Sequence, residues 1–447
     1  MSPFLLALLS SVPALQEPAV KIAPPKGSPE ALAALTEEVI KDVERVRGLP
    51  FKRPVPKHVR SKEEVRRFVE KALAKEMPAE VWGPRERFYK RLGLLPADCD
   101  FGAAVEEVLV EQIGGFYDPD TGEFVVVGSF GPTIDRFVVA HELTHALDDQ
   151  HFDLKRLTEE ARNEEDRSFV VAAVAEGSGM LVAQVYLTGR VIRSEPGEAA
   201  KLMDEMKGVD AIQAEQLRRA PPYLQRMLLV PYLQGMTFLQ KGIQSPIPSV
   251  RPKDIDRAFR SLPRSAEQIL HPEKYWYEGA ADEPVVVTLP DLAPTLGPGW
   301  RKVDQSTLGE MFCALLVGET EEMPSLDPSD PEGLRAALEF FSKEWTNEGA
   351  EGWGGDRFAV YAKDAALVGA WLTVWDTPGD AEEFEAEWGK HRGDGAARRR
   401  ENDRVSIAVG EGVDRALLDR VVEQALREAK TKALERPENG GQSRPAR

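Results

Sequence analysis

The chain of 447 residues carries 57 Lys and Arg against 75 Asp and Glu, which gives a formal net charge of −18. So acidic a protein repels phosphate backbones, which argues against nucleic acid as its partner. Only two cysteines occur, Cys99 and Cys313, and the sequence leaves open whether they pair. Any metal site must therefore use histidine and carboxylate ligands.

The first residues resemble a secretory signal. An apolar run over 4–12 precedes a small-residue pattern at 12–14, so residues 1–16 are predicted to be a signal segment. The segment is short, and the first basic residue is Lys21, so the usual charged start is missing. We expect a secreted or periplasmic protein, with a cytoplasmic one as the alternative.

Helices and short extended segments alternate in the next part of the chain. Helix-start signals predict helices over 28–49 and 61–77, the second opened by a capping box of Ser61 and Glu64. Residues 51–59 are predicted to be extended and 101–115 helical. The sequence DPDTG, followed by a β-branched run, predicts a β-hairpin over 116–128.

Three helical segments are predicted in the middle of the chain, over 135–149, 166–189 and 199–242, the last broken by prolines. The apolar stretch 168–188 is long enough to cross a membrane, but Glu176 lies at its middle. A carboxylate there costs about 2.5–3.5 kcal/mol on insertion scales. We therefore expect no integral membrane span but a buried helix, in which Glu176 needs a partner.

A change of unit is predicted between about 323 and 356, where Pro, Asp and Gly are concentrated. The fold class expected is α+β, with a helix-rich catalytic region over 28–345 (core 105–280) and an α+β module over 346–432. The module's four tryptophans are expected in its core. The segment 433–447 lacks apolar residues and is predicted to be a disordered tail.

The strongest chemical signal is the segment FVVAHELTHALDDQHF. His141 and His145 lie four residues apart, so on a helix both project from one face and reach one ion. Zinc lowers the pKa of a bound water toward about 7, and Glu142, beside the first histidine, is placed to accept its proton. Chance produces this pattern in on the order of one such chain in a hundred. The alternative is a surface helix with stray histidines.

Zinc needs a third protein ligand, and Glu176 is the best candidate. It lies in an apolar helix among small residues at 172, 173, 177 and 179, which let another helix approach closely. Asp148 and Asp149 are too close along the first helix to reach the ion, and the acids at 164–166 are expected to be exposed at a helix start. The alternative for Glu176 is a buried pair with an arginine.

HELTH followed by a glutamate on a second helix resembles the gluzincin branch of the zincin metallopeptidases, the thermolysin-like arrangement. The resemblance covers residues 105–190. It implies a zincin-like catalytic region with a small sheet beside the HExxH helix. It also implies Zn²⁺ bound by His141, His145 and Glu176, with Glu142 as general base. A peptide substrate would lie along an edge strand near 123–128.

The chain departs from that family at two positions. An aspartate often follows the ligand glutamate by four residues and an asparagine often precedes it, but Met180 and Ala175 stand there. Support for a zinc histidine must then come from elsewhere, and Asp149 and Asp166 are the candidates.

A group that stabilises the oxyanion usually lies farther along the chain in this family. The sequence ILHPEKYWY offers His271, Tyr275 and Tyr277, of which His271 is our first choice. The alternative is a histidine that caps a turn beside core aromatics. His151 is a further candidate, or it only completes the zinc helix.

The sequence thus predicts a zinc-dependent peptidase that hydrolyses peptide bonds by a zinc-activated water with Glu142 as general base. Two alternatives stay open. One is a zinc amidase or esterase with the same metal site. The other is a catalytically silent, zinc-stabilised binding protein, which Ala175 and Met180 favour.

Overall fold

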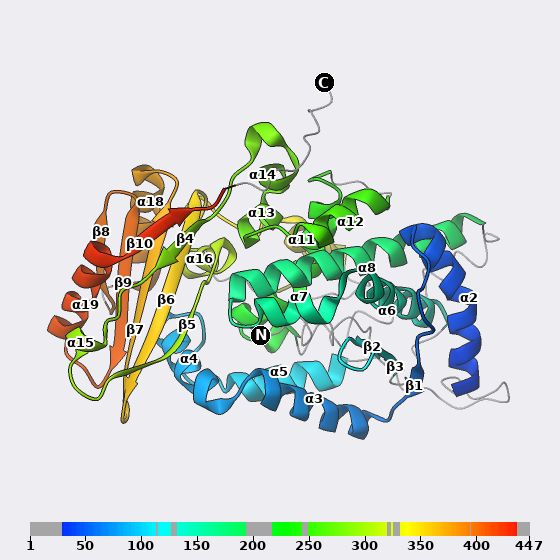
Figure 1. Cartoon of the computed structure of the whole chain (residues 1–447), viewed down its shortest axis with the longest axis horizontal. Helices are drawn as coiled ribbons and strands as arrows, with labels where there is room; N and C mark the ends of the chain where they lie inside the picture. Colours follow the sequence, from blue (N-terminus) through cyan, green and yellow to red (C-terminus); the bar gives the residue numbers. More distant parts are fainter. Residues whose placement is uncertain are drawn as a thin grey trace.

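The computed structural model describes residues 29–112, 115–126, 132–193, 217–243, 249–319, 323–324, 331–393 and 395–435. The predicted signal segment 1–16 and most of the predicted tail, 436–447, lie outside these residues. The fold is α+β, as the sequence predicts. A helical half and a half built on a larger sheet lie side by side along the long axis (Figure 1).

The N-terminal part contains helices and a small sheet. The helices are α2 (Pro29–Arg47), α3 (Lys62–Glu76), α4 (Ala79–Leu92) and α5 (Phe101–Gln112), and the strands are β1 (Lys57–Val59), β2 (Gly115–Asp118) and β3 (Glu123–Val126). The predicted capping box opens α3, because the side chains of Ser61 and Glu64 each accept the other's backbone N–H. The predicted hairpin is formed by β2 and β3.

Strand β3 lies in the centre of the small sheet, whose order is β1-β3-β2. It pairs antiparallel with β2 and parallel with β1. The edge strand predicted near 123–128 is therefore wrong over the described residues 123–126. Residues 51–59 are predicted to be extended, but the sequence gives no indication that β1, at the end of this segment, pairs with β3.

The helices of the middle region follow in chain order. They are α6 (Pro132–Phe152), α7 (Leu154–Ala161), α8 (Glu165–Arg193), α11 (Pro222–Leu239), α12 (Pro252–Arg260), α13 (Ala266–Leu270), α14 (Pro272–Trp276) and the 3-10 turn η1 (Glu278–Ala280). The HELTH motif lies within α6, as predicted. Helix α11 begins at the predicted proline break but continues through Pro231.

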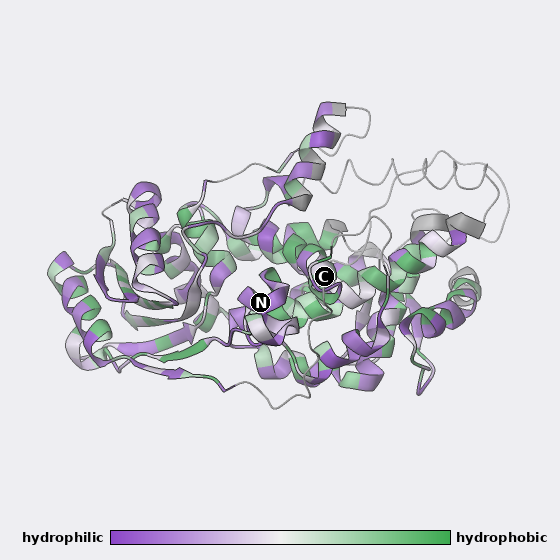
Figure 2. Ribbon diagram, turned by 90° about the horizontal axis from the view of Figure 1, so that it is seen from above, coloured by the Kyte–Doolittle hydropathy of each residue, from purple (hydrophilic) through white to green (hydrophobic). Residues whose placement is uncertain are grey.

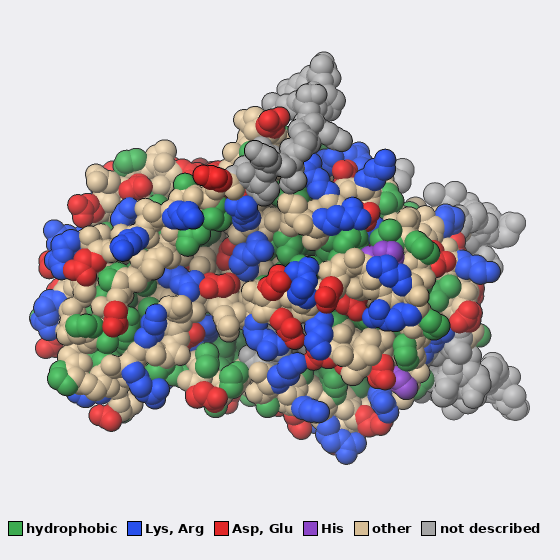
Figure 3. Space-filling view, in the orientation of Figure 1, with side chains coloured by type: hydrophobic (Ala, Val, Ile, Leu, Met, Phe, Trp, Pro, Cys, Tyr) green, Lys and Arg blue, Asp and Glu red, His purple; other side chains and the backbone are tan. Residues whose placement is uncertain are grey.

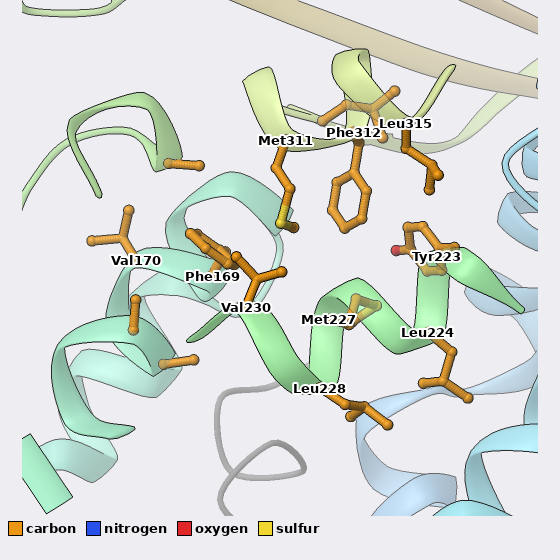
Figure 4. Close-up of a cluster of buried hydrophobic side chains, with 14 of the residues drawn as sticks. Phe169, Val170, Tyr223, Leu224, Met227, Leu228, Val230, Met311, Phe312 and Leu315 are labelled. Carbon is orange, nitrogen blue, oxygen red and sulfur yellow. The ribbon is translucent and has the colours of Figure 1, made fainter. Parts of the chain in front are cut away.

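Helices α8 and α11 are in backbone contact at glycines. A Cβ atom on Gly235 would lie 2.0 Å from the Ala173 carbonyl oxygen, and one on Gly177 would lie 2.4 Å from the Gly235 carbonyl carbon. The small residues of α8 thus admit a second helix, as predicted. Beside this contact, apolar side chains of α8, α11 and α16 (Glu310–Val317) point toward one another in one core (Figure 4).

Helix α8 is long and apolar enough over Glu165–Arg190 to cross a membrane by length and composition. In the structure, 72% of its apolar window is buried inside the protein, as in a core helix. Figure 2 shows hydrophobic ribbon in the middle of the helical half. Glu176, which is 1% exposed, therefore lies among protein side chains.

The C-terminal half is built on an antiparallel five-stranded sheet of order β5-β6-β7-β9-β8. Its strands are β5 (Arg301–Ser306), β6 (Trp353–Lys363), β7 (Ala366–Trp375), β8 (Ala397–Glu401) and β9 (Arg404–Glu411). A separate ladder pairs β4 (Val285–Thr288) with β10 (Lys430–Ala433). The remaining helices are α15 (Ala293–Leu296), α17 (Pro331–Ser342), α18 (Pro378–Arg392) and α19 (Arg415–Glu428).

Alternate residues of β7 enter two different cores. Trp371 and Trp375 contact Phe384 of α18 in one core, whereas Val368 and Ala370 belong to the other core, which includes α19. The module's tryptophans at 353, 371, 375 and 388 are all buried, as predicted. The sheet begins with β5, which precedes residue 346, the predicted start of the module. The reason is that β5 is mostly polar and gives no strand signal.

Candidate metal centre

Helices α6 and α8 bring the side chains of His141, His145 and Glu176 together. The Nε2 atoms of the two histidines lie 2.8 Å apart. Glu176 Oε2 lies 3.1 Å from His141 Nε2 and 3.4 Å from His145 Nε2. All three side chains are buried. The structure therefore holds a group that could bind a metal ion, formed by the three residues that the sequence predicts as ligands.

The spacing of these atoms fits one small cation. Ligands about 2.0–2.1 Å from a tetrahedral zinc are separated from each other by about 3.3 Å. The observed separations of 2.8–3.4 Å are close to this value. Two imidazoles and one carboxylate are also a donor set typical of zinc sites that keep a fourth position for water or substrate.

The charges of the three groups are complementary. Burial opposes a charge on His145, but the Glu176 carboxylate outweighs it and raises the pKa of His145 to about 9. Burial likewise opposes ionisation of Glu176, but the imidazoles of His145 and His141 lower its pKa to about 2. Burial and His145 lower the pKa of His141. Glu176 is thus held as a carboxylate, the form that binds a cation.

Gly179 makes room for the first histidine. A Cβ atom at this position would lie 2.7 Å from Cε1 and 2.9 Å from Nδ1 of His141. The His141 ring therefore lies directly against the backbone of α8. The ring of Tyr232 from α11 also stacks on His141, with a centroid distance of 6.1 Å and an interplanar angle of 19°.

Replacing Gly179 by alanine is expected to lower the affinity for Zn²⁺ at least tenfold, because the added methyl group would displace the His141 ring. Competition with a chromogenic chelator measures this affinity. Gly83→Ala in α4 is the matched control, since a Cβ atom there meets nothing within 4 Å. Equal affinity in Gly179→Ala and Gly83→Ala would show that the ring position does not matter.

Asp148 links the two helices that carry the triad. Its carboxylate accepts from Ser178 Oγ of α8 at 2.6 Å and from Arg47 Nε of α2 at 2.8 Å. Arg47 also donates to Asp256 of α12 at 2.8 Å. Ser178 lies two residues beyond Glu176, so these contacts fix α6 against α8 at the metal centre. This contact of Asp148 was not predicted from the sequence, in which Asp148 is only a rejected ligand candidate.

The two aspartates expected to support a zinc histidine make other contacts. Asp149 accepts from the Tyr117 hydroxyl at 2.7 Å and from the Leu154 N–H at 2.9 Å. Asp166 accepts the Ala266 N–H at 2.8 Å. Among the described residues, Nδ1 of His141 is buried without a hydrogen-bond partner. Neither aspartate therefore supplies the support that the sequence analysis proposed.

The carboxylate of Glu142 is oriented by the small sheet. Its Oε2 accepts the backbone N–H of Tyr117 on β2 at 2.8 Å. Glu142 is fully buried and favours the charged form of His145, so it lies near the triad. Glu142 is thus the residue that links β2 to the metal centre.

His271 is engaged outside the metal centre. It lies between α13 and α14, and its Nε2 is 2.9 Å from Glu310 Oε1 of α16. Burial opposes its charge, but Glu310 raises the pKa of His271. Tyr275 donates to the Ser261 carbonyl, and His151 Nε2 lies 2.8 Å from the Pro50 carbonyl oxygen. These contacts join His271, Tyr275 and His151 to partners other than the triad.

Tyr232 lies beside the triad in the structure, and the sequence did not predict it there. It is half-buried, in contrast to the fully buried triad. Its sequence neighbours, VPYLQG, carry no recognisable motif. Only Gly235, which allows α11 to approach α8, could have indicated that this helix lies at the site.

The start of α8 is anchored to the C-terminal sheet. The Glu164 carboxylate lies 2.7 Å from the Arg357 guanidinium of β6. Glu165 accepts from Arg85 of α4 at 2.9 Å, and Arg85 also binds both carboxylate oxygens of Asp304 on β5 at 2.6 Å. The expectation of exposed acids at 164–166 is therefore wrong for Glu165 and its neighbour Asp166, which are 5% and 3% exposed.

Comparison with known proteins concerns the C-terminal half. Residues 296–433 match the model of a domain of unknown function, DUF8575. The match covers less than a third of the chain and includes β5 to β10 but no residue of the triad. No curated protein and no solved structure matches the chain significantly.

Proposed function

We propose that the protein is a zinc-dependent peptidase of the gluzincin type. The observation that carries this proposal is the convergence of His141, His145 and Glu176 from two helices, with Glu142 beside the first histidine. A site with three protein ligands keeps a fourth position for chemistry. A structural zinc site would instead be closed by a fourth protein ligand.

Zn²⁺ would supply Lewis-acid activation of water and of the substrate carbonyl. Glu142 would accept the proton of the attacking water and later pass it to the leaving amine. The Tyr117 N–H holds the Glu142 carboxylate in place through Oε2. Tyr232 is half-buried beside His141 and would be near a substrate bound there.

The substrate would lie along β2 in place of β3. Among the described strands, β1 and β2 are the two edges of the small sheet, and β2 is the one whose Tyr117 N–H reaches Glu142. An extended peptide that added to this edge would bring its backbone next to the general base. Main-chain pairing of this kind selects a peptide over a small amide or ester.

A catalytically silent, zinc-stabilised binding protein is the second candidate. The observation that favours it is the buried Nδ1 of His141, which has no hydrogen-bond partner among the described residues. Ligand histidines of zinc enzymes almost always donate this N–H to a carboxylate, a backbone carbonyl or a water.

Elemental analysis of the purified full chain tests the metal centre. We expect about one zinc per wild-type chain and at least a tenfold loss in Glu176→Ala, because the site loses its anionic ligand. Glu63→Ala, at an exposed position of α3, is the control. Full retention of zinc in Glu176→Ala would overturn the assignment.

Hydrolysis assays separate the candidates. A peptidase cleaves unfolded protein, whereas an amidase or esterase acts only on small substrates. The silent protein hydrolyses neither, although its melting temperature falls when a chelator removes the metal.

A further inference from the structure

A cleft of about 800 Å³ lies between the end of α6, helix α7 and the connection from α12 to α13. None of the triad residues lines it, and Glu142 does not line it either. Its volume is within the range of about 300–1,000 Å³ that is typical of ligand sites. Figure 3 shows Lys and Arg side chains on the face that carries α7 and α12.

Positive charge predominates in this cleft, although the chain as a whole is acidic. Four arginines line it against two acids, Asp153 and Glu160. Arg156 lies 2.7 Å from Glu160 on the same helix, so its charge is neutralised locally. The other three arginines of the lining, at 167, 260 and 264, have no ion pair as short as this one.

Among the described residues, Arg260 and Arg264 form only long ion pairs and Arg167 forms none. The nearest carboxylate oxygens lie 3.7 Å from Arg260, on Asp256, and 3.6 Å from Arg264, on Glu283. Arg167 forms no ion pair within the described part of the chain, and its guanidinium donates to the Pro263 carbonyl.

Arg167 and Arg264 repel each other inside the cleft. Burial lowers the pKa of Arg167 and Arg264 lowers it further, although Asp166 and Glu160 oppose this effect. An oxyanion between the two guanidinium groups would offset the repulsion. Arginine is well suited to this, because its planar fork binds carboxylates through two parallel hydrogen bonds.

The cleft also has an apolar wall. The rings of Phe152 and Phe259 stack with a centroid distance of 4.8 Å and an interplanar angle of 10°. The Arg260 guanidinium lies over the Phe152 ring, 5.6 Å from its centroid. Leu157 and Leu262 extend the apolar surface. A ligand that fits this cleft therefore carries an apolar group next to its carboxylate.

We propose that this cleft binds an acidic peptide segment, with carboxylates held by Arg167, Arg260 and Arg264 and an apolar side chain against Phe152 and Phe259. The apolar wall distinguishes such a segment from inorganic phosphate, which has nothing to place there. The proposal does not depend on the peptidase function, because the cleft shares no residue with the metal centre.

Fluorescence anisotropy of a labelled peptide tests this site on the full chain. The probe alternates Glu with Phe or Leu, and the comparison peptide has Gln at each Glu position. A chelator is present so that hydrolysis does not consume either peptide. We expect the Glu peptide to bind at least tenfold more tightly than the Gln peptide, and the double variant Arg167→Gln/Arg264→Gln to lose at least tenfold of this affinity.

Arg260→Gln provides an independent variant, because its side chain is 68% exposed and its loss should not affect folding. It should weaken binding of the Glu peptide, whereas Arg335→Gln, an exposed arginine of α17, should not. Equal binding of the two peptides would overturn the proposal. So would unchanged binding by Arg260→Gln, or displacement of the probe by inorganic phosphate and by a Phe-free acidic peptide with equal strength.

Discussion

Replacement of Glu142 by glutamine is expected to lower the rate of peptide hydrolysis at least a hundredfold while bound zinc stays at the wild-type level. Glutamine keeps the size of the side chain and can still accept the Tyr117 N–H, but its amide cannot take a proton from water. The rate is measured with a fluorogenic unfolded protein, and zinc by elemental analysis of the same sample.

The control for this variant is Gln in place of a glutamate outside the site, Glu63→Gln on α3. It should leave both the rate and the zinc content unchanged. A Glu142→Gln protein that keeps zinc and hydrolyses peptides at the wild-type rate would refute a general-base role. Loss of zinc in this variant would instead assign Glu142 to metal binding.

Replacement of Gly235 by alanine is expected to lower the free energy of unfolding by about 3 kcal/mol. The added Cβ atom would lie 2.0 Å from the Ala173 carbonyl oxygen, and backbone on both sides leaves no flexible side chain to move. Helices α8 and α11 must then separate, and the core shown in Figure 4 loses packing. Urea denaturation followed by circular dichroism measures the change.

Gly83→Ala is again the matched control, because a Cβ atom there meets nothing within 4 Å. Alanine in a helix is more stable than glycine by roughly 0.5–1 kcal/mol, so this control should be slightly stabilised. If Gly235→Ala unfolds at the same urea concentration as the wild type, the close crossing of the two helices is not required for the fold.

The motif-bearing elements could be predicted from the sequence because their signals are local. Helical spacing of His141 and His145 and an isolated acid in an apolar helix are enough to predict a shared site, and the structure brings these residues together. The Ser61–Glu64 capping box and the DPDTG turn are local in the same way.

Long-range pairings could not be predicted from the same signals. Strand β1 pairs with β3 across more than 60 residues, and nothing in its three residues identifies the partner. The bond between Ser178 and Asp148 depends on how two helices are rotated against each other. The same holds for Tyr232, whose position follows from the glycine contact between α8 and α11.

The anchoring of α8 to the larger sheet has a consequence for how the molecule can be divided. Arg85, on a helix of the N-terminal part, binds Glu165 and Asp304 at once and is only 7% exposed. A fragment that ended before β5 would leave this guanidinium short of one of its two counter-charges, and breaking such a buried pair costs about 3–5 kcal/mol. The region that matches DUF8575 therefore stabilises the start of α8, the helix that carries Glu176. Neither half should survive excision as a self-sufficient folding unit, and the intact chain should melt in one calorimetric transition.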